Sequence, residues 1–301
     1  MTRLFISALM LMSFSIFASS ELYQAQDWVL DDTFTQGIEG PAVDKRGMLY
    51  VVNFAKQGTI GRIRAKNNVE LFIQLPENSV GNGIRFDQQG NMYIADYVNH
   101  NILLIDHYAQ NQALVEPRHI QVYAHSPLMY QPNDLAIMDN GILFASDPNW
   151  AKNTGKLWRV NGKRELHLLE QDMGTTNGIE VSPDNKILYV NESVQRNIWR
   201  YDINEQGKVS NKRLLIQFAD FGLDGMRTDR AGNLLVARYG KGVIAIISPE
   251  GKLIREVNLK GKYPTNLAFG GIDGKQVFVT MQKRGAIEMF THEWPGRSFK
   301  H

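Results

Sequence analysis

Six segments of the chain begin with a side chain that carries an oxygen atom. These side chains are Glu39, Asn82, Asn133, Asn177, Asp224 and Asn266. Ca²⁺ binds about six to eight carboxylate, amide and water oxygens, whereas Zn²⁺ prefers histidine and cysteine. None of the six is a histidine, and the chain contains no cysteine. The set therefore predicts a site for Ca²⁺ or another hard cation such as Mg²⁺ or Mn²⁺. Its expected ligands are two charged and two neutral oxygen donors, from Glu39, Asn133, Asn177 and Asp224.

The same residues also have a simpler interpretation as turn formers. Glycine follows four of the six, and Asn-Gly and Asp-Gly pairs are common in turns. For one segment alone, a turn is the better interpretation. Glutamate is not a turn specialist, however, and Glu39 occupies the same place in its segment as the others do. A ring of oxygen ligands therefore explains the complete set better than turns do.

The elements that must position these residues follow from an internal repeat of 42 to 51 residues. Each unit contains several short β-branched or aromatic runs separated by turns, as in segments 81–87 and 90–96. A period in the forties with about four strands is typical of a β-propeller blade. The last unit is short, and the extended run 27–32 lacks a partner, so we expect this N-terminal strand to complete the last blade. The predicted fold is all-β: a six-bladed β-propeller of four-stranded antiparallel blades.

Composition excludes several classes of function. The 301 residues include 33 Lys and Arg against 31 Asp and Glu, so the chain lacks the basic excess of nucleic-acid-binding proteins. The absence of cysteine excludes disulfides, thiolate metal sites and cysteine nucleophiles. No Gly-x-Ser-x-Gly segment and no Gly-rich phosphate loop is present.

The first 20 residues have the pattern of a secretory signal peptide. Arg3 precedes an apolar run over residues 4–18, and small residues follow it. An uncleaved anchor is the alternative, although the run is shorter than the about 20 residues of a membrane span. We expect a signal peptide at 1–20 and one propeller domain at 21–301. The mature protein would be a secreted or periplasmic monomer without a stable membrane span.

The order of these motifs resembles the SMP-30/gluconolactonase/luciferin-regenerating-enzyme family of six-bladed propellers. The resemblance rests on short motifs around Glu39, Asn133, Asp147, Asn177, Asp224 and Asn266, spread over residues 37–280. It implies that Glu39, Asn133, Asn177 and Asp224 bind a divalent ion, and that the substrate is a small-molecule lactone or ester. One position differs, because sugar-lactone members carry a substrate-binding arginine where this chain has Gln131.

This resemblance implies a metal-dependent hydrolase, most simply a lactonase, in which the ion polarises the substrate carbonyl and water attacks it. Asp224 is the candidate general base, and Asp147 is the second candidate. We expect Asn133, Gln131 and Asn82 to contact the substrate.

Two other functions stay open from the sequence: a phosphotriesterase-like hydrolase on the same ion, and a non-catalytic binding propeller with a structural ion. A histidine-assisted lactonase is a weaker possibility, for which His125 is the best-placed histidine. Five aromatic residues lie near loops beside the inner strands; packing between blades is the favoured role, and lining of the pocket by some of them is the alternative. They are Tyr97, Tyr130, Trp150, Tyr239 and Tyr263.

Overall fold

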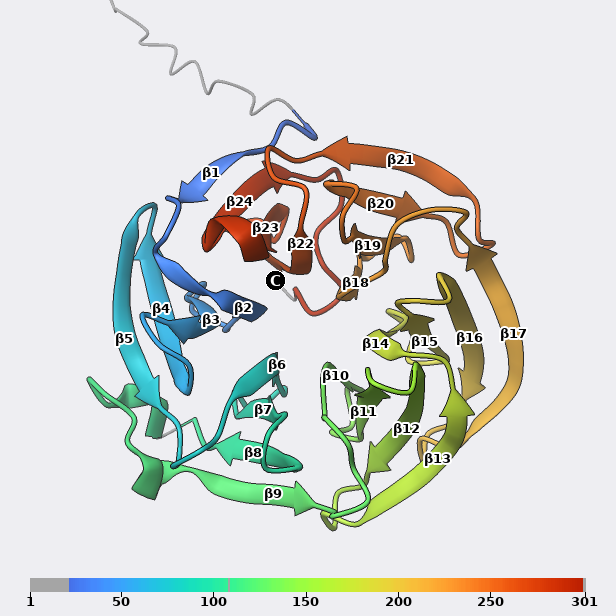
Figure 1. Cartoon of the computed structure of the whole chain (residues 1–301), viewed down its shortest axis with the longest axis horizontal. Coiled ribbons are helices and arrows are strands. Elements are labelled where there is room, and N and C mark those ends of the chain that lie inside the picture. Colours follow the sequence, from blue (N-terminus) through green and yellow to red (C-terminus); the bar gives the residue numbers. More distant parts are fainter. Residues whose placement is uncertain (1–21, 108, 300–301) are drawn as a thin grey trace, which may run out of the picture.

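The computed structural model describes residues 22–107 and 109–299, which form a ring of six four-stranded sheets (Figure 1). Neighbouring strands within each sheet are antiparallel. The six-bladed, all-β propeller predicted from the repeat is therefore confirmed. The predicted signal peptide lies outside the described residues, and its prediction stays untested.

The first three blades run from their inner to their outer strands in sequence order. Blade 1 contains β2 (Phe34–Val43), β3 (Leu49–Phe54), β4 (Thr59–Ala65) and β5 (Asn68–Gln74). Blade 2 contains β6 (Gly81–Phe86), β7 (Met92–Asp96), β8 (Asn101–Ile105) and β9 (Gln121–His125). Blade 3 contains β10 (Leu135–Ile137), β11 (Leu143–Asn149), β12 (Thr154–Val160) and β13 (Leu166–Met173).

The remaining blades continue the ring, and the last one is completed by the N-terminal strand. Blade 4 contains β14 (Thr176–Val181), β15 (Ile187–Glu192), β16 (Asn197–Ile203) and β17 (Val209–Gln217). Blade 5 contains β18 (Met226–Thr228), β19 (Leu234–Arg238), β20 (Val243–Ile247) and β21 (Leu253–Asn258). Blade 6 contains β22 (Pro264–Gly270), β23 (Gln276–Met281), β24 (Ala286–Thr291) and, outermost, β1 (Gln26–Val29).

Three short 3₁₀ turns complete the described secondary structure. They are η1 (Ala109–Asn111), η2 (Pro117–His119) and η3 (Gln282–Arg284). No helix in the described part of the chain has the length and apolar character needed to cross a membrane.

Burial decreases from the centre of the ring to its rim, and the sequence changes with it. Every residue of the inner strand β14 is buried, whereas most of the outer strand β17 is exposed and carries polar side chains. Six apolar clusters fill the interfaces between neighbouring blades, one at each interface. Removing these clusters from water is the main force that holds the blades together.

The two ends of the central channel differ. We call the end at which the inner strands begin the mouth, and the other the far end. A buried charge cluster lies along the channel: Arg85 pairs with Asp134 at 3.0 Å, and Arg227 lies 3.6 Å from the same carboxylate. The C-terminal segment runs to the centre of the ring (Figure 1) and closes the far end. There, Arg297 donates to the Ile137 carbonyl at 3.1 Å.

Candidate functional site

A cavity of about 320 Å³ lies at the mouth of the channel, and every blade contributes to its lining. Its floor is formed by six polar residues at the start of the inner strands: Glu39, Asn82, Asn133, Asn177, Asp224 and Thr265. Five of these are the residues that open the sequence repeats. In blade 6, Thr265 takes the lining position, and the predicted Asn266 lies beneath it with its Oδ1 accepting from the Leu267 N–H at 2.9 Å.

Close packing of neighbouring inner strands brings these side chains together. A Cβ atom on Gly40 would lie 1.8 Å from the Asn82 carbonyl oxygen, and one on Gly178 would lie 2.2 Å from the Asp224 carbonyl oxygen. The glycine after the polar residue therefore allows the next blade to approach. Because Glu39 lies within β2 and Asn177 within β14, these residues are not turn formers, and the alternative interpretation as turns is wrong for them.

The two carboxylates of the floor disfavour each other's charge. Burial raises the pKa of Glu39 to about 7, and the negative charge of Asp134 adds to the shift. Burial also raises the pKa of Asp224 well above its usual value, and the neighbouring Glu39 carboxylate raises it further. A hydrogen bond from the Asn177 amide lowers it in part. The repulsion between the two carboxylates is removed when one of them binds a proton or when both bind a cation.

Two buried amide oxygens complete a donor set that fits a hard cation. Asn133 Oδ1 and Asn177 Oδ1 are buried, and neither has a hydrogen-bond donor within the described residues. A buried acceptor left in this state is costly unless a ligand satisfies it. The described residues contain no group of three or more His, Cys, Asp or Glu side chains suited to a metal, so any ion here would depend on the amides. Two carboxylate and two amide donors suit Ca²⁺ better than Zn²⁺.

The residues predicted to contact substrate occupy different places. Asn82 lines the cavity, and its amide donates to the Asn133 carbonyl oxygen at 3.0 Å, which ties two floor residues of adjacent blades together. Gln131 is half-buried two residues before Asn133, and it is not among the residues that line the cavity.

Asp147, the second candidate base, is fully buried beside the site rather than on its lining. Its Oδ1 accepts from the main-chain N–H groups of Tyr130 and Gln131 at 2.8 and 2.6 Å. Its Oδ2 accepts from Trp158 Nε1 at 2.8 Å. Burial raises the pKa of Asp147, and these donors oppose the shift. With both oxygens bonded, this side chain fixes the loop that leads to Asn133.

The upper wall of the cavity is made by residues that the sequence did not single out as a set. Each immediately follows the second strand of its blade: Trp150, Ser193, Tyr239 and Gln282. Tyr239 Oη donates to Gln282 Oε1 at 2.5 Å and links the wall of blade 5 to that of blade 6. Trp150 and Tyr239 line the cavity, which was the less favoured of the two roles predicted for them. These residues share one position in the repeat, and this position could have identified them from the sequence.

The candidate histidine lies away from this site. His125 is exposed on β9, an outer strand, with its Nδ1 2.9 Å from Asn101 Oδ1. No histidine is among the residues that line the cavity.

Comparison with known proteins agrees with this geometry. A 6-deoxy-6-sulfogluconolactonase of Pseudomonas putida is 29% identical over 147 residues, which cover 48% of this chain and 50% of the relative. The match therefore spans about half the length of that relative. A diisopropyl-fluorophosphatase of Loligo vulgaris is 26% identical over 297 residues, which cover 88% of this chain and 93% of the relative.

A solved structure of similar fold is that of a calcium-binding protein, regucalcin, from Agrobacterium tumefaciens. It superposes with a TM-score of 0.76 at 20% identity and covers 90% of this chain and 95% of its own. The model of the SMP-30/Gluconolactonase/LRE-like region matches residues 38–283, which include all six floor residues. The chain therefore belongs to the SMP-30/gluconolactonase/LRE-like family.

Proposed function

We propose that the chain is a secreted or periplasmic hydrolase that uses Ca²⁺, or another hard divalent cation, to cleave lactones or related esters. The observation that carries the proposal is the pair of buried amide oxygens, on Asn133 and Asn177, that lack a donor beside two carboxylates. The family and the relative named as a sulfogluconolactonase support lactones as the substrate class. Export is supported by the pattern of residues 1–20.

Glu39, Asn133, Asn177 and Asp224 would hold the cation. A divalent cation supplies a Lewis acid that polarises a carbonyl oxygen and stabilises the negative charge that develops on it. Asp224 accepts a proton from the attacking water at a carboxylate oxygen. The ring C–O bond then breaks, and the ring oxygen takes up a proton. The product is the hydroxy acid. The two roles of Asp224 compete, because a carboxylate bound to a cation is a weaker base.

The neighbours of these residues hold them in place. Asp147 fixes the main chain of Tyr130 and Gln131, and thereby the approach to Asn133. Asn82 holds the Asn133 carbonyl from the adjacent blade. We assign Asp147 a positioning role and keep it as the second candidate base, which an Asp147→Asn variant tests through its pH–rate profile.

A second candidate is a phosphotriesterase-like hydrolase. The observation that favours it is the length of the match to the fluorophosphatase, which covers 93% of that relative. The same floor would then polarise a phosphoryl oxygen in place of a carbonyl oxygen.

A panel of lactones, aryl esters and phosphotriesters, assayed with EDTA and with added CaCl₂, separates these candidates. We expect calcium-dependent lactone hydrolysis that Glu39→Gln and Asp224→Ala abolish with the β-sheet circular dichroism intact. Asp273→Asn, in the exposed β22–β23 turn, is the matched control and keeps full activity. Undiminished turnover after complete chelation contradicts the proposal, and activity on none of the substrates points to a non-catalytic binding propeller.

A further inference from the structure

The wall above the carboxylates of the cavity carries no charge. Trp150, Ser193, Tyr239 and Gln282 form it, and none of these side-chain types carries a charge near pH 7. The equivalent residues of blades 1 and 2, Ala55 and Tyr97, are also uncharged. No lysine, arginine or histidine is among the lining residues, so the cavity offers a substrate aromatic faces and neutral hydrogen-bonding groups.

Apolar side chains are exposed in the loops around this mouth. They occur in five of the loops from blade 2 to blade 5: Val98, Leu128, Tyr130, Trp150, Val194 and Phe221. Exposed apolar residues are ordinary when scattered, but a group around the opening of a cavity marks a surface that binds apolar ligands. The largest is Trp150, which is 41% exposed and also lines the cavity.

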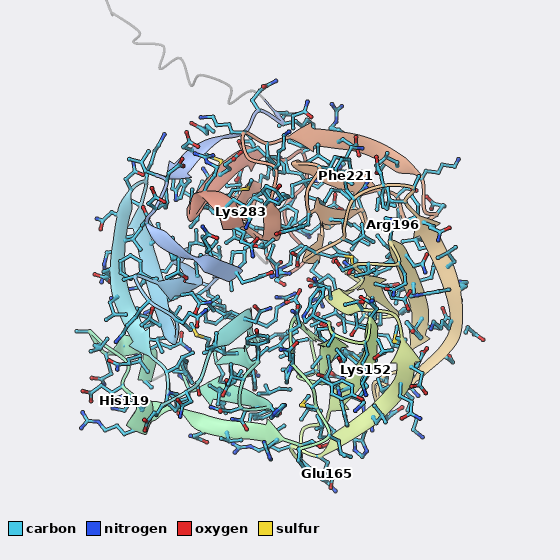
Figure 2. The ribbon with its side chains drawn as sticks, in the orientation of Figure 1. His119, Lys152, Glu165, Arg196, Phe221 and Lys283 are labelled. Carbon is cyan, nitrogen blue, oxygen red and sulfur yellow. The ribbon has the colours of Figure 1, made fainter. Side chains whose placement is uncertain are left out.

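Phe221 is presented at the mouth in a strained backbone conformation. Its φ of 48° lies in the left-handed region, which is unfavourable for a bulky residue and costs about 1–3 kcal/mol. The side chain is nonetheless 48% exposed, so burial of the ring does not explain the conformation. A Cβ on Gly240 would lie 3.2 Å from Phe221 Cδ1, which places the ring beside the residue that follows Tyr239. Figure 2 shows Phe221 over blade 5.

We propose that the site takes lactones or esters that carry an uncharged, apolar substituent, and that Trp150, Tyr239 and Phe221 bind this substituent. The inference rests on the proposed function and narrows its substrate class. The reacting carbonyl would lie on the polar floor, and the substituent would extend along the aromatic wall toward solvent. An anionic substituent would find no charged partner on this wall.

The main alternative is an anionic substituent bound by lysines at the mouth. Lys56, Lys152 and Lys283 lie in the loops between the second and third strands, and all three are exposed. None of them is among the lining residues, so we expect them to be solvated. Figure 2 labels Lys152 and Lys283 on different blades.

The test is a series of five-membered lactones that share one ring and differ in the length of one alkyl chain. Gluconolactone and 6-phosphogluconolactone provide the hydroxylated and anionic arms. Because each methylene that moves onto an apolar wall is worth up to about 0.8 kcal/mol, we expect kcat/KM to rise about two- to fourfold per methylene. A higher kcat/KM for either sugar lactone than for the longest alkyl lactone overturns the inference.

Variants locate the effect on the wall. Trp150→Ala and Tyr239→Leu are expected to flatten the dependence of kcat/KM on chain length. Phe221→Asn removes the ring but tolerates the left-handed conformation. It is therefore expected to reduce the dependence without loss of thermal stability. Lys152→Ala, two residues from Trp150, is the matched control and leaves the dependence unchanged. If kcat/KM depends on chain length in Trp150→Ala, Tyr239→Leu and Phe221→Asn as it does in wild type, the inference is contradicted.

Binding of alkylcyclopentanones, which cannot be hydrolysed, separates this inference from the proposed function. Affinity that rises with chain length, measured by tryptophan fluorescence and lost in Tyr239→Leu, supports the apolar wall even if no lactone is cleaved. In that case the proposed lactonase function is wrong, and the inference that the wall binds apolar groups is supported. If lactones are hydrolysed but chain length affects neither the rate nor the binding, the proposed function holds and the inference about the wall is wrong.

Discussion

Glu39 and Asp224 lie side by side in a buried floor, where each raises the pKa of the other or of its neighbours. Such a pair destabilises the cation-free fold, and a bound cation reverses the effect. If the proposed cation binds here, the chain gives up some stability of the cation-free protein in return for a preformed set of ligands. The amides of Asn133 and Asn177 contribute to the set without adding repulsion.

We predict that Glu39→Gln stabilises the cation-free protein. At pH 8 in EDTA the variant should gain about 1–3 kcal/mol in the free energy of unfolding, because one buried charge is removed. Wild type should gain about 2.7 kcal/mol from Ca²⁺ at a hundred times its Kd, and the variant less. Denaturation in urea with EDTA or CaCl₂ measures both.

Glu180→Gln is the control for this experiment. The Glu180 carboxylate faces arginines, with Arg297 at 3.4 Å and Arg85 at 3.9 Å, so its loss should destabilise the protein in both buffers. Destabilisation of Glu39→Gln in EDTA would show that the two floor carboxylates do not repel each other.

Cation affinity should rise with pH. Because Glu39 has a pKa of about 7, it holds a proton at pH 6 that the cation must displace, and we expect the affinity to increase about tenfold per pH unit below pH 7. The same raised pKa makes the cation-free fold bind more protons than the unfolded chain between about pH 4.5 and 7, so its stability falls as the pH rises through this range. Calcium titration calorimetry at pH 6, 7 and 8 tests the first statement. Equal affinity at all three values would contradict it.

At the scale of the elements, β1 closes the ring through a partly buried ion cluster. Arg284 binds Asp27 of β1 at 2.8 Å and the fully buried Glu288 of β24 at 2.7 Å. A hydrogen bond from Lys260 and the ion pair with Arg284 hold the pKa of Asp27 below its usual value. The stability that Asp27 contributes is therefore lost only as the pH falls through its folded-state pKa, below about 3.8.

We predict that Arg284→Met lowers the free energy of unfolding by about 3 kcal/mol, because Glu288 is left buried without its cation. Amide exchange in β1 and β24 should accelerate more than in blade 3. Arg213→Met, which removes a half-exposed pair with Asp202, is the matched control and should cost about 0–1 kcal/mol. Equal effects of the two substitutions would mean that the cluster does not lock the ring.

How much was predictable from the sequence depended on repetition. The floor residues could be predicted because the same polar position recurs at the start of the repeats, and β1 because residues 27–32 lacked a partner beside a short last unit. The wall was missed because its position recurs but its chemistry changes from Trp150 to Ser193 to Gln282. The partners of Asp147 were not predictable, because main-chain donors leave no trace in residue type.

At the scale of the whole molecule, the C-terminal segment closes the far end of the channel. The Arg297 side chain is only 8% exposed there, donates to the Ile137 carbonyl of blade 3 and pairs with Glu180 of blade 4. A small molecule that reaches the cavity would therefore enter and leave through the mouth, because the C-terminal segment lies at the far end.

We predict that Arg297→Ala lowers the free energy of unfolding by about 1–3 kcal/mol, since it leaves a buried carbonyl and a carboxylate without this donor. Calcium affinity should not change, because the mouth lies at the other end of the channel. Arg230→Ala, with an exposed side chain, serves as the control for denaturation and calcium titration. A weaker calcium affinity without loss of stability would contradict this separation of the two ends.

The closure of the ring by β1 also sets an order of events during synthesis. Gln26 pairs with Met289, so the strand that leaves the ribosome first finds its partner only when nearly the whole chain has been made. Contacts this distant in sequence form slowly. Until then β1 lacks its partner strand and the ring is open. A delay of this kind keeps the chain unfolded for longer, which would suit a polypeptide that has to cross a membrane before it folds.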